Sequence, residues 1–137
     1  MSKTFTIIKP DSVSKGNFGK IISRIEQDGF RILAIKKLHL TTQQAEKFYA
    51  VHRERPFYQS LVTYMTSGPV YVAALERDDA VAALRKVMGA TDPSKADAGT
   101  IRKEFGESIE RNAIHGSDSE ENAGIEIGFF FAQYELV

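Results

Sequence analysis

The segment NAIHGSDS, residues 112–119, places one histidine among small and polar side chains. A neutral imidazole, whose ordinary pKa is about 6.5, is a competent nucleophile at cellular pH. It can attack a phosphorus atom and carry the phosphoryl group as a covalent phosphohistidine. His115 is therefore a candidate nucleophile for phosphoryl transfer.

The residues that follow this histidine fit two interpretations. Gly116 allows a bulky ligand to approach the backbone, and Glu126 lies far enough along a predicted helix to reach back and orient the imidazole. Ser117, Asp118 and Ser119 equally form a polar turn that caps the last helix. From the chemistry of these residue types, the active-site interpretation and the structural one are equally well supported.

Phosphoryl transfer needs positive charge around the transferred group. The sequence offers four cations on separate segments that can converge on the histidine: Lys9, Arg55, Arg85 and Arg102. Taken singly, each of them is better explained as a solvated surface charge. The other two histidines are interpreted as structural or solvated, since His39 ends a predicted strand and His52 lies on a predicted helix.

Composition limits the class of protein. The chain has 137 residues, of which 42% are hydrophobic and 26% charged, as is typical of one compact globular domain. Because 18 lysine and arginine residues balance 18 acidic ones, a general binder of nucleic acid or membrane surfaces is disfavoured. The absence of cysteine excludes disulfides, thiolate catalysis and cysteine zinc sites. Since no long apolar segment is present, we expect a cytoplasmic protein with no membrane partner.

Hydrophobic periodicity and turn residues predict the elements that must position these side chains. Runs of β-branched and apolar residues predict strands at 4–10, 31–40, 70–76 and 112–115. Helical spacing and end signals predict helices at 19–30, 41–54, 57–65, 77–89 and 117–126. Ser117 and Glu120 have the spacing of a capping box for the last helix. Residues 89–109 show no clear period and are predicted as a loop.

This order of elements fits a split βαβ arrangement with helices on one sheet face. The helices inserted after the second strand would elaborate it. No internal repeat, low-complexity tract or linker divides the chain. We therefore expect a single α/β (α+β) domain over residues 1–137, a ferredoxin-like sandwich in which helices pack on a four-stranded antiparallel sheet.

The common phosphate-binding loops GxxxxGK[ST] and GxGxxG are absent from the chain. The segment GNFG, at 16–19, has the GxxG pattern of the loop with which KH domains clamp nucleic acid. A turn into a helix explains this segment better, and the zero net charge disfavours nucleic acid as a primary partner. The alternative predicts salt-dependent RNA binding through Lys15 and Lys20.

An ordered set of motifs resembles the nucleoside diphosphate kinase family along essentially the whole chain. The motifs are IKPD, RPFY, SGPV, LRKVMGATDP, GTIRKEFG and NAIHGSDS, in that order. The resemblance implies that His115 takes the γ-phosphoryl group of a nucleoside triphosphate, typically ATP, as a pros-phosphohistidine and passes it to a nucleoside diphosphate. Such a ping-pong exchange uses one pocket for donor and acceptor in turn.

The same resemblance implies roles for further residues. Ser117 and Glu126 orient the histidine, and Lys9 assists by contacting the phosphate and sugar region. Phe57 stacks on the base, which implies broad specificity because every base has a π face. The remaining nucleotide-binding residues are Tyr49, Arg85, Thr91, Arg102 and Asn112.

Cofactor and assembly are also implied by the resemblance. Mg²⁺ is expected to arrive on the nucleotide phosphates, because the sequence shows no dedicated carboxylate cage for it. A homo-oligomer built from dimers, either a tetramer or a hexamer, is expected, with the second strand contributing to the dimer. Departures from the usual family pattern remove no proposed ligand; they are Ser12, Asp92, Ala98 and the pair Lys103–Glu104. A nucleotide sensor without turnover is the alternative, and the intact set of site residues argues against it.

Overall fold

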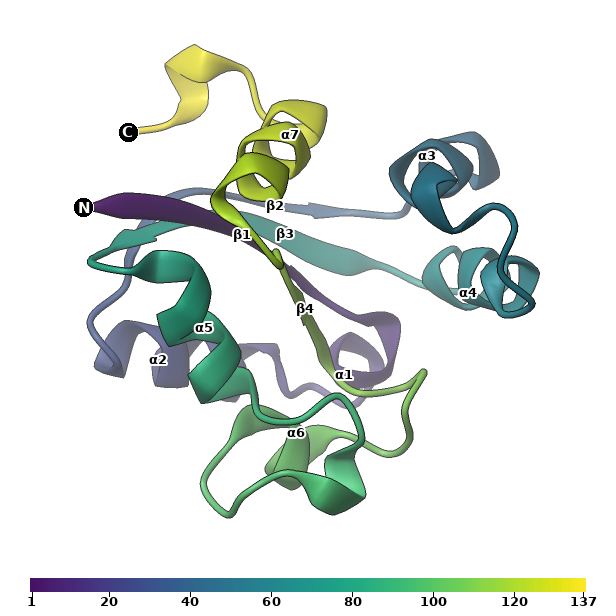
Figure 1. Ribbon diagram of the computed structural model, residues 1–137, viewed down its shortest axis with the longest axis horizontal. Coiled ribbons are helices and arrows are strands. Elements are labelled where there is room, and N and C mark those ends of the chain that lie inside the picture. The colour runs from purple at the N-terminus through teal and green to yellow at the C-terminus, as the bar shows by residue number, and fades with distance from the viewer.

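The computed structural model describes residues 1–137, and its centre is a four-stranded sheet (Figure 1). The strands are β1 (Ser2–Ile8), β2 (Arg31–Leu38), β3 (Val70–Arg77) and β4 (Ile114–Gly116). They lie in the order β2-β3-β1-β4, and each neighbouring pair is antiparallel. The predicted antiparallel split βαβ sheet is therefore confirmed.

Seven α-helices connect and cover these strands. They are α1 (Pro10–Ser14), α2 (Phe18–Gln27), α3 (Thr42–Phe48), α4 (Tyr58–Met65), α5 (Ala80–Met88), α6 (Ile101–Phe105) and α7 (Glu120–Phe130). Short 3₁₀ turns follow at η1 (Ala50–His52), η2 (Pro93–Lys95) and η3 (Gln133–Glu135). None of the helices combines the length and the apolar character that crossing a membrane requires.

Helices pack on both faces of the sheet, whereas the sequence predicted them on one face (Figure 1). Along β3, Val72 and Ala74 join a core cluster with Ile127 of α7. The alternate residue Leu75 instead joins a second cluster with Leu84 of α5. Because successive side chains of a strand point to opposite faces, a continuously apolar strand such as VYVAAL needs cover on both sides.

The inserted helices form a projecting unit, here called the arm (residues 42–65), that comprises α3, η1 and α4 (Figure 1). The predicted helix at 41–54 is shorter than expected, since α3 ends at Phe48 and a 3₁₀ turn continues the chain. Its beginning agrees with the prediction, because Thr41 and Gln44 form a capping box. The chain therefore turns at Tyr49 and allows α4 to pack back against α3.

The predicted loop at 89–109 contains a helix that the sequence analysis missed. Helix α6 has only five residues, and Thr100 caps it by accepting a hydrogen bond from the backbone N–H of Lys103. So short a helix completes little more than one turn, which leaves no hydrophobic period to detect. Helix α1, of equal length, was missed for the same reason.

The beginning of the last helix also differs from the prediction. Ser119, not Ser117, is the N-cap of α7, and its hydroxyl accepts a hydrogen bond from the N–H of Asn122 at 3.1 Å. The capping box predicted for Ser117 and Glu120 is therefore wrong. The Ser117 side chain is buried and is used elsewhere in the fold. The helix continues past both of its glycines to Phe130, four residues beyond the predicted end.

Candidate active site

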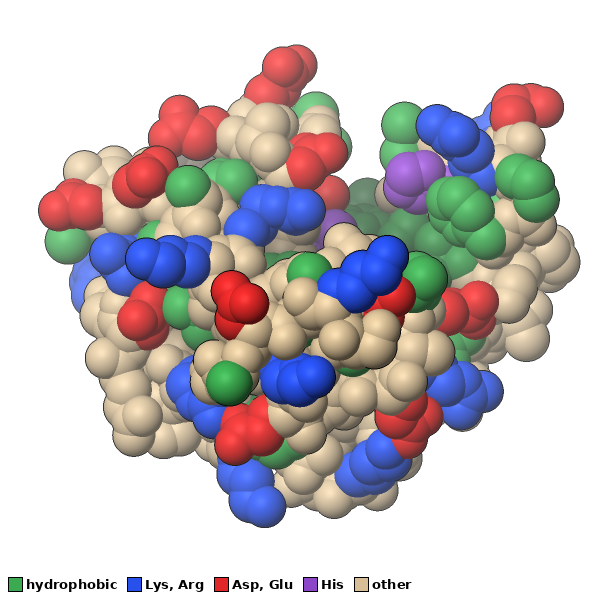
Figure 2. Space-filling view, turned by 60° about the horizontal axis from the view of Figure 1, so that its bottom comes forward, with side chains coloured by type: hydrophobic (Ala, Val, Ile, Leu, Met, Phe, Trp, Pro, Cys, Tyr) green, Lys and Arg blue, Asp and Glu red, His purple; other side chains and the backbone are tan.

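A cleft of about 710 Å³ separates the arm from the rest of the fold. Figure 2 shows it as a notch in the surface, with histidine side chains in and beside it. The arm contributes one wall, and α7 with the segments around β4 contributes the other. The lining residues with polar groups include Arg85, Thr91, Arg102, His115, Asp118 and Glu126. Residues from four distant parts of the chain thus meet at one cleft.

His115 lies in the middle of β4, opposite Ile7 of β1, and its side chain is 23% exposed to solvent. Its Nε2 atom is 2.9 Å from Oε1 of Glu126, which is on α7. The same carboxylate oxygen accepts a 2.7 Å hydrogen bond from Oγ of Ser117. A carboxylate only accepts hydrogen bonds, so Nε2 carries a proton, and in the neutral form of the ring the lone pair is on Nδ1. The contact with Glu126 therefore leaves Nδ1 as the ring nitrogen that can act as nucleophile.

Gly116 allows helix α5 to approach strand β4, whereas the sequence analysis expected this glycine to allow the approach of a ligand. A Cβ atom there would lie 2.5 Å from the sulfur of Met88 and 3.2 Å from a methyl group of Leu84. Glycine is thus required for α5 to pack against β4. The close approach also places Arg85 of α5 near the histidine, and its Nη1 donates to the Gly116 carbonyl at 3.3 Å.

Arg102 is almost fully buried and is fixed by main-chain acceptors. Its Nη2 donates to the carbonyl of Ile114 at 2.8 Å, and its Nη1 donates to that of Gly89 at 3.2 Å. Its Nε is buried without a hydrogen-bond partner. Burial, with the nearby charge of Arg85, lowers the pKa of Arg102 to about 10, so the guanidinium is charged at neutral pH. A buried unpartnered donor on a charged group suits an anionic ligand.

Lys9 and Asn112 form a buried pair beside the cleft rather than part of its lining. Nζ of Lys9 donates to Oδ1 of Asn112 at 2.8 Å, and Nδ2 of Asn112 donates to the carbonyl of Thr91 at 3.0 Å. Thr91 itself lines the cleft. Burial, followed by the charge of Arg102, lowers the pKa of Lys9 to about 8. The ammonium group is therefore only partly charged in mildly alkaline solution.

The aromatic residues of the arm are placed differently from one another. Phe57, just before α4, is 46% exposed, and its ring centre lies 5.4 Å from that of His52. Tyr49 is in the core and 6% exposed, and it does not line the cleft. Its hydroxyl is buried without a partner, and burial together with Glu126 raises its pKa. Phe57 is also absent from the cleft lining, but its exposed ring lies beside His52, which lines the cleft, whereas Tyr49 packs against Phe48 and supports the wall.

Other predicted residues lie outside this cleft. Arg55 is in the turn after η1 and is absent from the lining. Lys15, proposed for the RNA-binding alternative, forms an ion pair with Glu107. Gly16 has φ of +75° and Gly19 is already in α2, as expected for a turn into a helix.

Several cleft residues were missed by the sequence analysis. Asp118 accepts a 2.6 Å hydrogen bond from Asn122, which lowers the pKa of Asp118. Ile125 and Phe129 of α7 are exposed at 63% and 39% and line the same cleft. His52 also lines it, although it was interpreted as structural or solvated. The sequence held a signal for Ile125 and Phe129, because the segment GIEIGFFF carries apolar residues on all sides of the helix. A helix that buries only one face is polar on the other, so the additional apolar residues indicate a second apolar contact.

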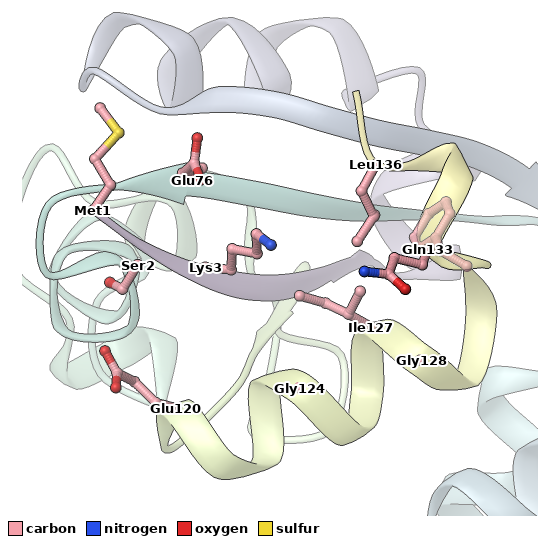
Figure 3. A pocket seen from close by; sticks show the side chains of 11 residues that line it. Met1, Ser2, Lys3, Glu76, Glu120, Gly124, Ile127, Gly128, Gln133 and Leu136 are labelled. Carbon is pink, nitrogen blue, oxygen red and sulfur yellow. The ribbon is translucent and has the colours of Figure 1, made fainter.

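A second hollow, of about 630 Å³, lies along α7 near the N-terminal end of β1 (Figure 3). Its polar side chains include Lys3, Glu76, Glu120 and Gln133. It contains none of the predicted site residues. Volume therefore does not distinguish the two hollows, whereas the oriented histidine and the arginines do.

Comparisons with known proteins agree on one family. A family model described as "Nucleoside diphosphate kinase" matches residues 2–136. The nucleoside diphosphate kinase of a Nitratiruptor species is 60% identical over 137 residues, and that of Geotalea daltonii is 57% identical, with all of each chain covered.

Solved structures give the same result. That of the Aquifex aeolicus nucleoside diphosphate kinase is 47% identical, with a TM-score of 0.97 and 99% of each chain covered. The halophilic nucleoside diphosphate kinase from Halobacterium salinarum, in complex with CDP, is 40% identical with a TM-score of 0.95. That match covers 99% of this chain and 91% of the other.

Proposed function

Because the chain belongs to the nucleoside diphosphate kinase family and is a phosphotransferase, we propose that its reaction passes through a phosphohistidine at Nδ1 of His115. The observation that carries this proposal is the contact of 2.9 Å between Nε2 of His115 and the Glu126 carboxylate. It leaves the other ring nitrogen as nucleophile in a cleft that also holds Arg85 and Arg102.

In the first half-reaction, the Nδ1 lone pair of His115 attacks the γ-phosphorus of a nucleoside triphosphate, typically ATP. The bond from that phosphorus to the β,γ-bridging oxygen breaks, and the nucleoside diphosphate leaves with the electron pair. The Nε2–H proton stays on the ring, where Glu126 stabilises the positive charge that develops. In the second half-reaction, a terminal phosphate oxygen of another nucleoside diphosphate attacks the phosphohistidine, and the N–P bond breaks.

The remaining residues bind and position the nucleotide in this proposal. Arg85 and Arg102 stabilise the charge on the transferred phosphoryl group, and Lys9 assists them. Thr91 contacts the phosphates, and Asn112 the sugar. Phe57 stacks on the base, and stacking accepts purines and pyrimidines alike. Tyr49 was predicted to bind nucleotide, but its burial favours an indirect role in supporting the cleft wall.

Mg²⁺ enters this proposal as part of the substrate, bound to the nucleotide phosphates. The fold gathers no group of three acidic or histidine side chains suited to a metal ion. The cationic residues of the cleft are suited instead to the phosphate oxygens left free by the ion.

We also propose a homo-oligomer built from dimers, as a tetramer or hexamer. Strand β2 is at the edge of the sheet, and an edge strand offers unpaired backbone groups to a second copy. Light scattering of the purified protein distinguishes these states from a monomer. A single domain and a cytoplasmic location stay predictions from the composition.

Labelling tests the proposed chemistry against the nucleotide-sensor alternative. After incubation with Mg²⁺ and γ-labelled ATP, we expect an acid-labile phosphate that maps to His115 and is removed by unlabelled dTDP. ATP binding without label would support the sensor. Label that dTDP does not remove would contradict the ping-pong route.

Replacing Glu126 with glutamine is expected to slow phosphorylation of His115 by about tenfold. The amide keeps the shape of the carboxylate, but it is neutral and does not stabilise the imidazolium that develops. Single-turnover mixing with labelled ATP measures the rate. Ser117→Ala is the matched comparison, because it removes the other hydrogen bond to the same oxygen and should have a smaller effect. Unchanged rates in Glu126→Gln would contradict the proposal that the carboxylate charge stabilises the developing imidazolium.

The pH dependence should report Lys9. A lysine is charged below its pKa, and the pKa of Lys9 in the free protein is lowered to about 8. We therefore expect kcat/KM for ATP to fall as the pH rises through about 8, while kcat changes less because bound phosphate favours the charged amine. Initial rates between about pH 7 and about pH 9.5 test this. The decrease should vanish in Lys9→Arg, and a flat profile in the unmodified protein would contradict the prediction.

A further inference from the structure

The arm makes few polar contacts with the rest of the fold. Its buried residues, such as Val62 and Met65, pack in the apolar core. Hydrogen bonds join the arm to segments distant in sequence at two places. One is between Tyr64 and Asp11; in the other, Oγ of Ser60 lies 3.0 and 2.9 Å from the carboxylate oxygens of Glu110. This contact joins the first turn of α4 to the loop that leads from α6 to β4 (Figure 1).

The contact lies close to the proposed stacking residue. Ser60 follows Phe57 by three residues, and residues at that spacing are neighbours on one face of a helix. The other end of α4 is held separately, because the Tyr64 hydroxyl donates to the buried carboxylate of Asp11. The guanidinium of Arg111 also lies 5.2 Å from the Tyr64 ring. The end of α4 that carries Phe57 is therefore the end that depends on Ser60.

Glu110 also reaches the opposite end of the proposed nucleotide site. Its main-chain carbonyl accepts a hydrogen bond from Nζ of Lys9 at 3.4 Å. The same Nζ donates to Asn112, which is the proposed sugar contact. One residue thus contacts the base-binding wall through its side chain and the sugar–phosphate groups through its main chain.

We propose that Glu110 is a positioning residue which, through Ser60, fixes the distance between Phe57 and the groups that bind sugar and phosphate. The sugar of a nucleotide sets the distance between its base and its phosphates. If Phe57 and the phosphate-binding groups are already held at that distance, the nucleotide binds without first ordering the arm. This inference rests on the proposed function, because it takes Phe57 as the stacking partner of the base.

The test compares acceptors with and without a base. In Ser60→Ala and Glu110→Ala we expect KM for dTDP to rise about three- to tenfold with kcat nearly unchanged, the loss expected for one exposed hydrogen bond. The double variant should resemble either single one. Ser60→Thr and Glu110→Gln keep a hydroxyl donor and an acceptor, so their KM should stay near that of the unmodified protein. For ribose 5-diphosphate, which lacks a base, KM should be the same in all variants.

Unchanged KM for dTDP in both alanine variants would overturn the inference. An equal rise with ribose 5-diphosphate would also overturn it, because the effect would then not involve the base. If Glu110→Gln behaved like Glu110→Ala, the negative charge and not the hydrogen bond would be the cause, which would overturn the hydrogen-bonded link. Failure of the proposed function is observed differently, as absence of labelled His115 in the unmodified protein.

Discussion

Replacing His115 with alanine is expected to abolish the labelled phosphoprotein and to lower phosphoryl transfer from ATP to dTDP by at least about a thousandfold. The expected effect is large because the imidazole of His115 forms the bond to phosphorus, and His52, the other histidine that lines the cleft, has no carboxylate hydrogen-bonded to its ring. Glu126 accepts a hydrogen bond from Ser117, and a guanidinium group has only donors and offers no lone pair. A coupled assay with ATP and dTDP measures the transfer, and acid-labile label measures the intermediate.

The matched control for His115→Ala is His39→Ala. The ring of His39 contacts the main-chain carbonyl of Thr66 at 2.7 Å and is absent from the cleft lining. This variant should retain both activity and label. The ring of His115 packs edge-on to Phe5 and Phe48, so its removal could destabilise the fold. Thermal unfolding of His115→Ala tests whether the variant is folded. Label or substantial turnover surviving in folded His115→Ala would contradict the mechanism.

Replacing Arg102 with alanine is expected to lower kcat/KM by roughly a hundredfold, because a charged hydrogen bond to phosphate contributes about 1.5–3 kcal/mol. The side chain also satisfies the carbonyls of Gly89 and Ile114, so the variant should be less stable by about 2–3 kcal/mol. Steady-state kinetics and denaturant unfolding measure the two effects separately.

Arg85→Ala provides the comparison that separates binding from folding. Arg85 lines the same cleft but makes a single 3.3 Å hydrogen bond, to Gly116. We expect a loss of kcat/KM by about tenfold or more with little loss of stability. Arg102→Lys should restore the charge without the two main-chain contacts. Full activity in both alanine variants would contradict the assignment of these arginines to the phosphates.

Much of the fold follows from local patterns in the sequence. The β-branched runs at 31–40 and 70–76 predict β2 and β3. Strand periodicity and turn residues can be recognised within a few neighbouring positions of the sequence. Thr41 and Gln44 predict the start of α3 for the same reason. The errors occur where a local signal is short or ambiguous, as at α6 and at the beginning of α7.

The residues of the candidate site were also named from the sequence, since the ordered motifs carry them. His115, Glu126, Arg85, Arg102 and Thr91 all line one cleft, from β4, α7, α5, α6 and the loop after α5. Sequence chemistry alone left the histidine equally well explained as part of a capping turn. The contact between Nε2 and Glu126 supports the active-site interpretation, because the cap is provided by Ser119 instead.

The sequence by itself determined the four strands, the five longer helices and the residue types of the site, because short-range periodicity and ordered motifs specify them. Only the tertiary structure decided that helices cover both faces, that Tyr49 is in the core and that Ser60 meets Glu110. These outcomes depend on contacts between residues far apart in the chain. No local spacing encodes such contacts, since the crossing of strands and the packing of helices bring those residues together.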